Sequence, residues 1–462
     1  MRRYAVDRKA FHAHIKTQEN SVSRYRVLVH LGNHMRVGLQ AWGSEGDIQP
    51  FTALAAGLVR AGHEVTLVVT DNVGRNYTGL GQRFGYRVVA APNPQNPTPE
   101  EVEKVWRRII EVGNPIRQAE LILKYGVDPA TEVMYTAAQQ LCASSDVVIA
   151  HFFVFPLRVA AEKAKVPMAT VNVVHNCLPS RYINPPGLPD LGRWFYPMGW
   201  KLVRKMVNRI FLPRVNGLRT REGLKADEDV MSQTWAAEKL NLVGVSPSIC
   251  KRPPDWEPRH YVCGFLNPPA GLAAEELPEG LEEFLRRGAP PVYFTFGSMM
   301  PNSLDYIQET ANIWVSAIRK SGCRAIVQLP WDDLSAFPSD DRIFKVKRAP
   351  YKRVFPRCSV IVHHGGAGTT QSSLLSGRPS IIVAHMADQS FWGAELERLG
   401  VAGTTLKRKG LSGACLAKAI GQVLAHPELA TRASLIGQEM SKENGVDVAV
   451  RLIEEKLGCR RN

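Results

Sequence analysis

One stretch in the carboxyl-terminal half, SVIVHHGGAGTTQSSLL, constrains the fold more than any other. Its apolar run from Val360 to Val362 predicts a buried strand, and a histidine- and glycine-rich turn leads from this strand into a helix expected over Thr369 to Ser376. The start of such a helix presents free backbone N–H groups at the positive end of the helix dipole, which suits a diphosphate. The stretch therefore predicts a parallel α/β fold and an anion site that works without a metal.

A second strand and helix follow at once, expected over Ser380 to Val383 and Gln389 to Leu399. Asp388 and Gln389 come at the carboxyl end of this strand, which is the edge where open parallel sheets bind ligands. The glycine spacing does not fit a Walker loop, which needs a lysine followed by serine or threonine, nor a dinucleotide fingerprint, which needs a third glycine. Neither nucleotide motif therefore explains the stretch.

The order HHGGAGTT, then Gly-Arg-Pro, then Asp-Gln resembles the nucleotide-sugar signature of UDP-glycosyltransferases of the GT-B fold (family 1/28 type), especially the sterol glucosyltransferase-like branch. The resemblance implies an α/β fold with two Rossmann-like, doubly wound parallel-sheet domains that face a cleft. It also implies contacts to the donor. These are His364 on the pyrophosphate, Gly366, Gly368 and Thr369 on phosphate oxygens, and Asp388 and Gln389 on sugar hydroxyls. The alternative is a plain helix entry with core histidines.

Two further segments of the same half are similar to the family. A strand expected over Pro291 to Phe296 leads into FGSM, whose serine, here Ser298, reaches a phosphate in the family. The segment from Arg348 to Tyr351 lies where the family's base-stacking loop lies, although plant members have tryptophan and glutamine at its two ends. Ser372 stands where plant members carry a ribose-binding glutamate, and the sterol branch also lacks that acid. The resemblance therefore assigns Ser298, Arg348 and Tyr351 to the donor.

The amino-terminal half begins with a βαβ pattern: a strand over Met35 to Trp42, a helix over Ile48 to Ala61 and a strand over Val65 to Thr70. Its first turn resembles the family's GSRGD motif, with Glu45 where arginine is frequent. Asp47 has two possible roles, as a cap of the helix and as the general base that removes a proton from the acceptor hydroxyl. The resemblance places Gly43, Ser44 and Gly46 on the acceptor side.

The first sheet is expected to continue with strands over 87–90, 147–150 and 168–173 and to close there, with a helix over 156–164 and a long helical insertion from 99 to 143. The insertion is a plausible wall for the acceptor. His151 and His175 follow strand ends. We assign His151 to the acceptor side, with a hydrogen-bonded structural histidine as the alternative role.

The run KRPPDWEP contains too many prolines for a helix or a strand interior and predicts a linker. We therefore expect five regions. They are a basic extension 1–34, which is either a disordered arm or an upstream mis-start, an acceptor domain 35–250, a linker 251–260, a nucleotide-sugar domain 261–440, and a carboxyl-terminal helix 441–462 that packs back on the first domain.

The formal charge of +15 is concentrated in two places, residues 1–34 and 191–225, which argues against a nucleic-acid surface across the sheets. The eight cysteines show no C-x-x-C and no zinc spacing, as expected for reduced thiols in the cytoplasm. No stretch approaches the length of a membrane span, and the amino terminus lacks the apolar run of a secretory signal. A cytoplasmic protein is therefore expected.

Residues 191–225 hold nine basic side chains against one acidic one. Trp200, Val203, Val207 and Ile210 recur at helical spacing, with Lys201, Arg204, Lys205 and Arg209 between them. An aromatic lead, Trp194 to Tyr196, precedes this helix. The pattern fits peripheral contact with a membrane, and equally a helix on the core with a solvated basic face.

The resemblance covers about 420 residues and implies inverting transfer of a hexose, with glucose from UDP-glucose as first choice, to a hydroxyl of a sterol or other lipophilic aglycone. A transferase that uses a dTDP-sugar such as rhamnose, on a lipid or antibiotic-like aglycone, is the runner-up. The alternative classes are a nucleotide-sugar epimerase and a non-catalytic partner protein. No cofactor or metal is expected, because the one DxD-like tripeptide, 227–229, follows a charged stretch instead of an apolar strand.

Overall fold

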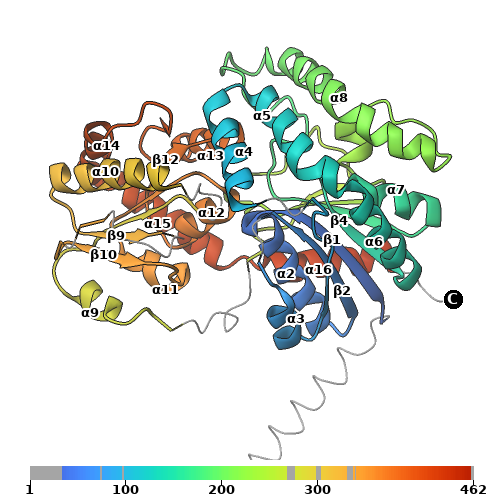
Figure 1. Ribbon diagram of the computed structural model, residues 1–462, viewed down its shortest axis with the longest axis horizontal. Coiled ribbons are helices and arrows are strands. Elements are labelled where there is room, and N and C mark those ends of the chain that lie inside the picture. Colours follow the sequence, from blue (N-terminus) through green and yellow to red (C-terminus); the bar gives the residue numbers. More distant parts are fainter. Residues whose placement is uncertain are drawn as a thin grey trace, which may run out of the picture.

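The computed structural model describes residues 34–72, 75–95, 98–267, 276–297, 303–329, 337–338 and 340–458. The basic extension expected over 1–34 lies, apart from His34, outside the described residues. Two parallel sheets organise the remainder, each covered by helices, and the halves of the chain lie side by side in Figure 1. The fold is α/β, with two Rossmann-like domains, as the sequence predicts.

The first sheet has seven parallel strands in the order β3-β2-β1-β4-β5-β6-β7. Their bounds are β1 Arg36–Gly43, β2 Glu64–Asp71, β3 Arg87–Ala90, β4 Val147–His151, β5 Met168–Asn172, β6 Leu240–Val243 and β7 His260–Val262. The expectation that the sheet closes at β5 is wrong. β6 and β7 have only four and three residues, and Asn241 interrupts the apolar run of the buried β6. Residues 251–260, expected to link the domains, connect β6 with β7 inside this sheet.

The second sheet has six strands in the order β10-β9-β8-β11-β12-β13. Their bounds are β8 Val292–Thr295, β9 Ala325–Gln328, β10 Ile343–Val346, β11 Val360–His363, β12 Ser380–Ala384 and β13 Leu406–Lys407. The central strands β8, β11 and β12 are mainly apolar and fully buried, because helices cover both faces of the sheet.

The helices follow the strands in the alternation expected of βα units. In the first half they are α2 Glu45–Arg60, α3 Thr78–Phe84, α4 Pro99–Val112, α5 Pro115–Ile122, α6 Thr131–Ser144, α7 Phe155–Ala164 and α8 Tyr196–Arg221, with short helical turns at 123–127, 128–130 and 230–234. In the second they are α9 Leu281–Arg286, α10 Leu304–Ser321, α11 Tyr351–Val354, α12 Ala367–Leu375, α13 Ala387–Arg398, α14 Gly413–Ala425, α15 Pro427–Ser441 and α16 Gly445–Leu457, with one turn at 355–357.

α16 returns to the first sheet and packs against α2 (Figure 1). Val446 and Val450 lie over Gly57, where an added Cβ would collide with Val446. The small residue therefore lets the two helices approach closely, and the end of the chain ties the second half to the first.

α8 has the predicted apolar stripe, and the stripe faces the core. Trp200, Val203 and Ile210 are buried against the core, as the solvated-face alternative requires, and Tyr196 is buried as well. Other apolar residues around its start are exposed instead, namely Leu191, Trp194, Phe195, Met198 and Leu202. No helix among the described residues is long and apolar enough to cross a membrane.

Candidate active site

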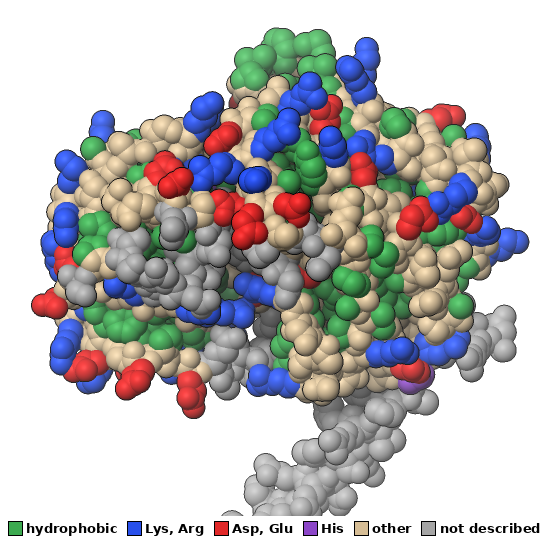
Figure 2. Space-filling view, viewed as in Figure 1, with side chains coloured by type: hydrophobic (Ala, Val, Ile, Leu, Met, Phe, Trp, Pro, Cys, Tyr) green, Lys and Arg blue, Asp and Glu red, His purple; other side chains and the backbone are tan. Residues whose placement is uncertain are grey.

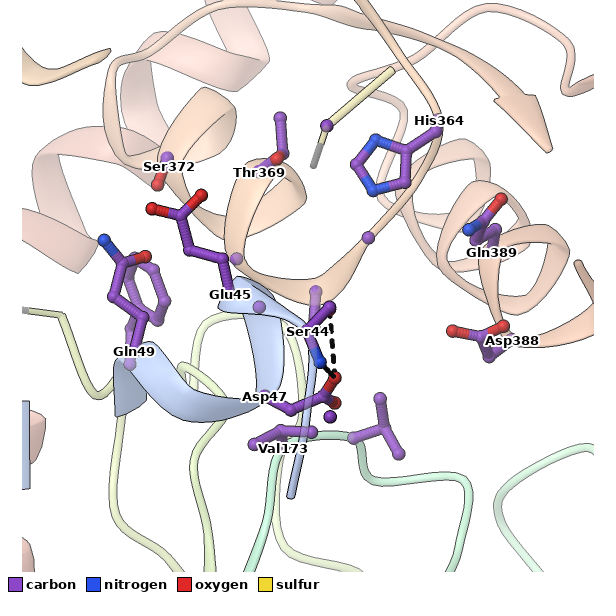
Figure 3. Close-up of a pocket in the computed structure, with 18 of the residues that line it drawn as sticks. Ser44, Glu45, Asp47, Gln49, Val173, His364, Thr369, Ser372, Asp388 and Gln389 are labelled. Carbon is purple, nitrogen blue, oxygen red and sulfur yellow. Dashed lines mark hydrogen bonds between the residues drawn. The ribbon is translucent and has the colours of Figure 1, made fainter. Parts of the chain in front are cut away.

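A cavity of about 1370 Å³ lies between the two sheets and is lined by the turns that follow β1, β11 and β12 (Figure 3). It brings together twelve of the fourteen residues expected at the site: Gly43, Ser44, Gly46, Asp47, Arg348, Tyr351, His364, Gly366, Gly368, Thr369, Asp388 and Gln389. Of the other two, Ser298 lies outside the described residues, and His151 lies just behind the wall.

Asp47 sits in the first turn of α2, and its Oδ2 accepts hydrogen bonds from the backbone N–H (2.9 Å) and the hydroxyl (3.0 Å) of Ser44. This capping box fixes the carboxylate and leaves Oδ1 free to face the cavity. Burial raises the pKa of Asp47 to about 6, against the two hydrogen bonds, and the charge of Asp388 adds to the rise. Capping and proton acceptance are therefore compatible in this geometry.

His151 is the last residue of β4 and is fully buried. Its Nδ1 accepts a hydrogen bond from the backbone N–H of Phe153 (3.4 Å), so the proton of the neutral ring is on Nε2. Nε2 lies 3.7 Å from Oδ1 of Asp47. Burial lowers the pKa of His151 to about 3, so the ring is neutral when Asp47 is charged. A neutral N–H donor thus stands behind the carboxylate.

His364 is held between two glycines. An added Cβ at Gly297 would come within 2.5 Å of the imidazole Cε1, and one at Gly366 would collide with Nε2. Gly365, with φ 89°, makes the turn, and its missing side chain makes room for Ile382 and the backbone of Gln389. Burial lowers the pKa of His364 to about 4, so the ring is a neutral hydrogen-bonding group.

The start of α12 is uncapped. Its N-cap residue is Gly366, which has no side chain to accept hydrogen bonds from the first-turn N–H groups. Gly368 and Thr369 lie in that first turn and line the cavity. Free N–H groups and the helix dipole therefore favour an anion at this point.

Asp388 and Gln389 begin α13, and Asp388 extends into the cavity opposite Asp47 in Figure 3. The Oε1 atom of Gln389 accepts from the backbone N–H groups of His385 (2.7 Å) and Met386 (3.2 Å). This oxygen caps α13, so the amide N–H₂ group is the part of the Gln389 side chain that remains to bind a ligand.

Arg348 and Tyr351 lie as expected at the outer end of the cavity, but both have partners in the protein. The ring of Tyr351 stacks on Phe355 with 4.1 Å between ring centroids. Arg348 extends across the cleft and pairs with Glu45 of the first domain at 2.6 Å. Arg75 pairs with the same carboxylate. Glu45, noted in the sequence only as a departure from the family motif, therefore joins the two walls.

Aromatic residues that we did not single out in the sequence form the inner wall of the cavity. Phe153 stacks on Phe211 of α8 at 5.5 Å, and Trp235 meets both edge-on. Trp42 and Phe152 complete the wall. The dipeptide Phe152-Phe153 directly after a buried strand was a usable signal, since such positions point to the ligand edge of the sheet.

Other contacts hold the two walls together. His175 Nε2 lies 3.5 Å from Glu395 Oε2 of α13, which gives His175 a structural position away from the cavity. Arg107 of α4 donates to Ser303 at 2.7 Å. These contacts join the two domains beside the cavity.

The acids of the DxD-like tripeptide are engaged elsewhere. Asp227 is buried and pairs with Arg219 at 3.2 Å, and Asp229 caps a helical turn through the N–H and hydroxyl of Ser232. No group of three or more histidine, cysteine or acidic side chains among the described residues could hold a metal ion.

Comparisons with known proteins agree with this geometry. Residues 37–178 match the glycosyltransferase family 28 N-terminal domain, and residues 325–454 match the erythromycin biosynthesis protein CIII-like C-terminal domain. The chain is similar to an O-mycaminosyltylonolide 6-deoxyallosyltransferase of Streptomyces fradiae, at 29% identity over 447 residues, which covers 91% of this chain and 97% of that protein. A sterol 3-beta-glucosyltransferase of Arabidopsis thaliana is 28% identical over 443 residues, 92% of this chain and 68% of that protein.

Among solved structures, the glycosyltransferase VinC in complex with dTDP has the same fold, with a TM-score of 0.59. It is 21% identical, and the match covers 91% of this chain and 98% of that one. These relatives transfer sugars, which favours a transferase over an epimerase or a non-catalytic partner. The chain is a glycosyltransferase of the GT-B fold, and its two halves are similar to the family 28 N-terminal and the erythromycin CIII-like C-terminal domains.

Proposed function

We propose that the enzyme transfers a hexose, with glucose from UDP-glucose as first choice, to a hydroxyl of a sterol or another lipophilic aglycone, with inversion at the sugar carbon. One observation carries this proposal. The cavity joins an aromatic wall from the first domain to an uncapped helix start from the second, and Asp47 stands between them. Such a cavity would place an apolar substrate against the aromatic wall and a diphosphate at the helix start, with the proton-accepting Asp47 between them.

Asp47 is the proposed general base. An acceptor hydroxyl is too weak an acid to ionise alone, so its proton moves to Oδ1 as the oxygen attacks the sugar carbon. Ser44 holds the other oxygen of the carboxylate. Nε2 of His151 lies on the protein side of Oδ1 at 3.7 Å, which is too long for a hydrogen bond in this state. Inversion follows because attack and departure occur on opposite faces of the sugar.

The leaving diphosphate gains negative charge as the glycosidic bond of the donor breaks. The first-turn N–H groups of α12 and the neutral imidazole of His364 are placed to donate hydrogen bonds to it. Asp388 and the amide of Gln389 are the proposed partners of sugar hydroxyls. Fixed dipoles of this kind stabilise the charge without a metal ion.

The acceptor is proposed to be lipophilic because of the wall made by Trp42, Phe152, Phe153, Phe211 and Trp235. The sterol 3-beta-glucosyltransferase relative supports a sterol, whereas the deoxyallosyltransferase relative and the dTDP-bound neighbour support the runner-up, a dTDP-sugar and an antibiotic-like aglycone. A lipophilic acceptor also fits a cytoplasmic enzyme that contacts a membrane through residues 191–225.

A donor screen tests the proposal. Binding of UDP-glucose, UDP, dTDP-glucose and dTDP-rhamnose is compared by calorimetry and thermal shift, because a bound donor raises the melting temperature. The bound donor is then incubated with cholesterol or a plant sterol in detergent, and with a soluble polyketide aglycone. Glucosylated sterol confirms the proposal. Transfer only from a dTDP-sugar, or only to the soluble aglycone, selects the runner-up.

A further inference from the structure

A second cavity, of about 1270 Å³, lies beside α13 and is separate in its chemistry from the first. Seven lysine and arginine side chains line it against two carboxylates, Asp190 and Glu395. Both acids are already engaged. Asp190 accepts from the backbone N–H of Gly192 and the hydroxyl of Tyr196, each at 2.9 Å, and Glu395 pairs with Arg398 at 2.8 Å. The cavity therefore carries an excess of positive charge.

Several of the cations have no acidic partner. Arg252 donates to three backbone carbonyls, of Trp256, Glu257 and His260, which fix the guanidinium without neutralising it. Lys251, Lys407 and Lys409 have no carboxylate partner among the described residues. Four positive charges thus meet at one cavity from both domains.

A buried donor of the lining also lacks a hydrogen-bond partner among the described residues. It is Nε of Arg408, in a side chain that is only 4% exposed. Buried polar groups normally find a partner. A ligand with acceptor oxygens would supply one.

The mouth of this cavity continues into the exposed apolar residues before and in the first turns of α8. Tyr182 and Arg193 line the cavity, and the Arg193 guanidinium stacks over the Tyr182 ring at 5.2 Å. The next residues are the apolar tip, defined as Leu191, Trp194, Phe195, Met198 and Leu202. Trp194 is 95% exposed, so it stands out from the surface and lines no groove.

Figure 2 shows hydrophobic side chains gathered at the top of the molecule, where Figure 1 shows the start of α8, with lysine and arginine side chains beside them. A protruding aromatic and aliphatic tip ringed by cations has the chemistry of a bilayer interface: the apolar groups enter the acyl region and the cations meet anionic headgroups.

We propose that the second cavity binds the phosphate of an anionic lipid while the apolar tip inserts into the bilayer that carries it. This inference sharpens the proposed membrane contact, because it assigns insertion to the tip and headgroup binding to the cavity instead of to the basic face of α8. It does not depend on which sugar is transferred. It places the enzyme at the surface where a lipophilic acceptor resides.

Sedimentation with vesicles of phosphatidylcholine, with and without phosphatidylglycerol, tests the proposal on the full chain. The cavity variant changes Lys251, Lys407 and Lys409 to Gln, and the tip variant carries Trp194→Ser and Met198→Ser. We expect the wild type to sediment with the anionic vesicles, and the cavity variant to bind on the order of a hundredfold more weakly at low salt. The tip variant should lose binding at both low and high salt.

Matched controls keep the result specific. Lys320→Gln with Lys418→Gln removes exposed charges on α10 and α14, and Leu435→Ser removes an exposed apolar residue of α15; all three positions lie outside both cavities. A third variant, with Lys201, Arg204, Lys205 and Arg209 changed to Gln, tests the basic face of α8. The Lys320/Lys418 and Leu435 controls should sediment like the wild type. The α8 variant should bind the anionic vesicles better than the cavity variant does.

Donor binding in solution, measured by calorimetry, should be unchanged in every variant, so failure of the lipid site and failure of the proposed reaction are separable. The proposal is overturned if wild type and both test variants sediment equally, or if the wild type does not sediment. It is also overturned if inorganic phosphate binds the cavity but vesicles do not, which would assign a soluble anion, or if the tip instead mediates self-association in ultracentrifugation.

Discussion

The two turns on opposite walls of the cleft are built alike, because each joins a strand to a helix, but they differ at the start of that helix. The turn after β1 leads into α2, and the turn after β11 leads into α12; both lie at the ligand edge of a parallel sheet. In the first, the Asp47 carboxylate reaches back and accepts hydrogen bonds from the N–H and the hydroxyl of Ser44. In the second, Gly366 leaves the N–H groups open. One helix start thus holds a carboxylate of the protein, whereas the other is free to receive an anion from a ligand.

This difference between the two helix starts matches their two proposed roles: Asp47 at the start of α2 is the general base, and the start of α12 binds the diphosphate of the donor. The two hydrogen bonds from Ser44 hold the Asp47 carboxylate within the protein, so Asp47 keeps its position in the empty enzyme. An uncapped start with a neutral histidine has unsatisfied donors until a diphosphate arrives. Changes that add or remove side-chain oxygens at either turn should therefore affect different steps.

The largest effect is expected for Asp47→Asn. Asparagine keeps an oxygen for the Ser44 N–H and hydroxyl but cannot accept a proton, so kcat should fall by ~100-fold or more while the helix stays capped. Melting curves and donor calorimetry check that fold and donor site are intact. Because folding raises the pKa of Asp47 to about 6, ionising it opposes folding as the pH rises from 4 to 6. The Asn variant should therefore not be less stable at pH 7. Full activity would move the base elsewhere.

The pH profile gives the next largest effect. Only ionised Asp47 accepts a proton, so kcat/KM should fall about tenfold per pH unit below pH 6. Removing the hydroxyl hydrogen bond in Ser44→Ala should raise the pKa of Asp47 and shift this acid limb to higher pH. His364 and His151, whose pKa values are about 4 and 3, are already neutral in this range. An acid limb that stays in place in Ser44→Ala would assign it to another group.

Local signals predicted both turns, because strand, glycine and helix-start patterns depend on residues close in sequence. His364 and Asp47 therefore lie where the motifs indicated. β6 and β7 were not predicted because they are short and because Asn241 interrupts the apolar run of β6. The Glu45–Arg348 pair joins positions 303 residues apart, and its formation depends on how the two domains face each other.

The α8 segment shows, within a single helix, the same limit of prediction from local sequence. The 3.6-residue period correctly identified an apolar stripe through Trp200, Val203 and Ile210, but periodicity does not say what the stripe faces. In the fold it packs on the core. The exposed apolar residues interrupt the period, at positions such as Met198 and Leu202, and only the structure shows them to be on the surface.

A third prediction concerns the donor side. His364→Ala should weaken binding of the nucleotide-sugar by about tenfold or more, because one hydrogen bond to the diphosphate is lost. Gly366→Ala should have a similar effect, since the added Cβ collides with His364 Nε2 and displaces the ring. The collision needs the imidazole, so the double variant should bind the donor as His364→Ala does, with no additive loss. Additive losses in calorimetry would show that Gly366 acts independently of the histidine.

A smaller effect is expected at the pair that joins the two turns' walls. Glu45→Gln should raise the KM for the donor only a few-fold, since exposed ion pairs contribute roughly 0.2 to 1 kcal/mol and are screened by salt. Arg348 is itself exposed, and Arg75 shares the carboxylate. The effect should disappear at high ionic strength. Glu64→Gln, which changes an exposed acid at the opposite, amino-terminal end of β2, serves as the control. A loss that persists in high salt would mean that Glu45 contacts the donor directly.

No effect is expected on removing divalent metal ions. The proposed site stabilises the leaving diphosphate with hydrogen bonds from the open N–H groups of α12 and from His364, so we expect it to work without a metal ion. The acids of the DxD-like tripeptide are held by Arg219 and Ser232, so they are not free to carry a metal under the diphosphate. Activity should be the same with excess EDTA, with magnesium and with manganese, for the wild type. Loss on chelation with rescue by manganese would contradict the account, and in that case His364→Ala should be more metal-dependent than the wild type.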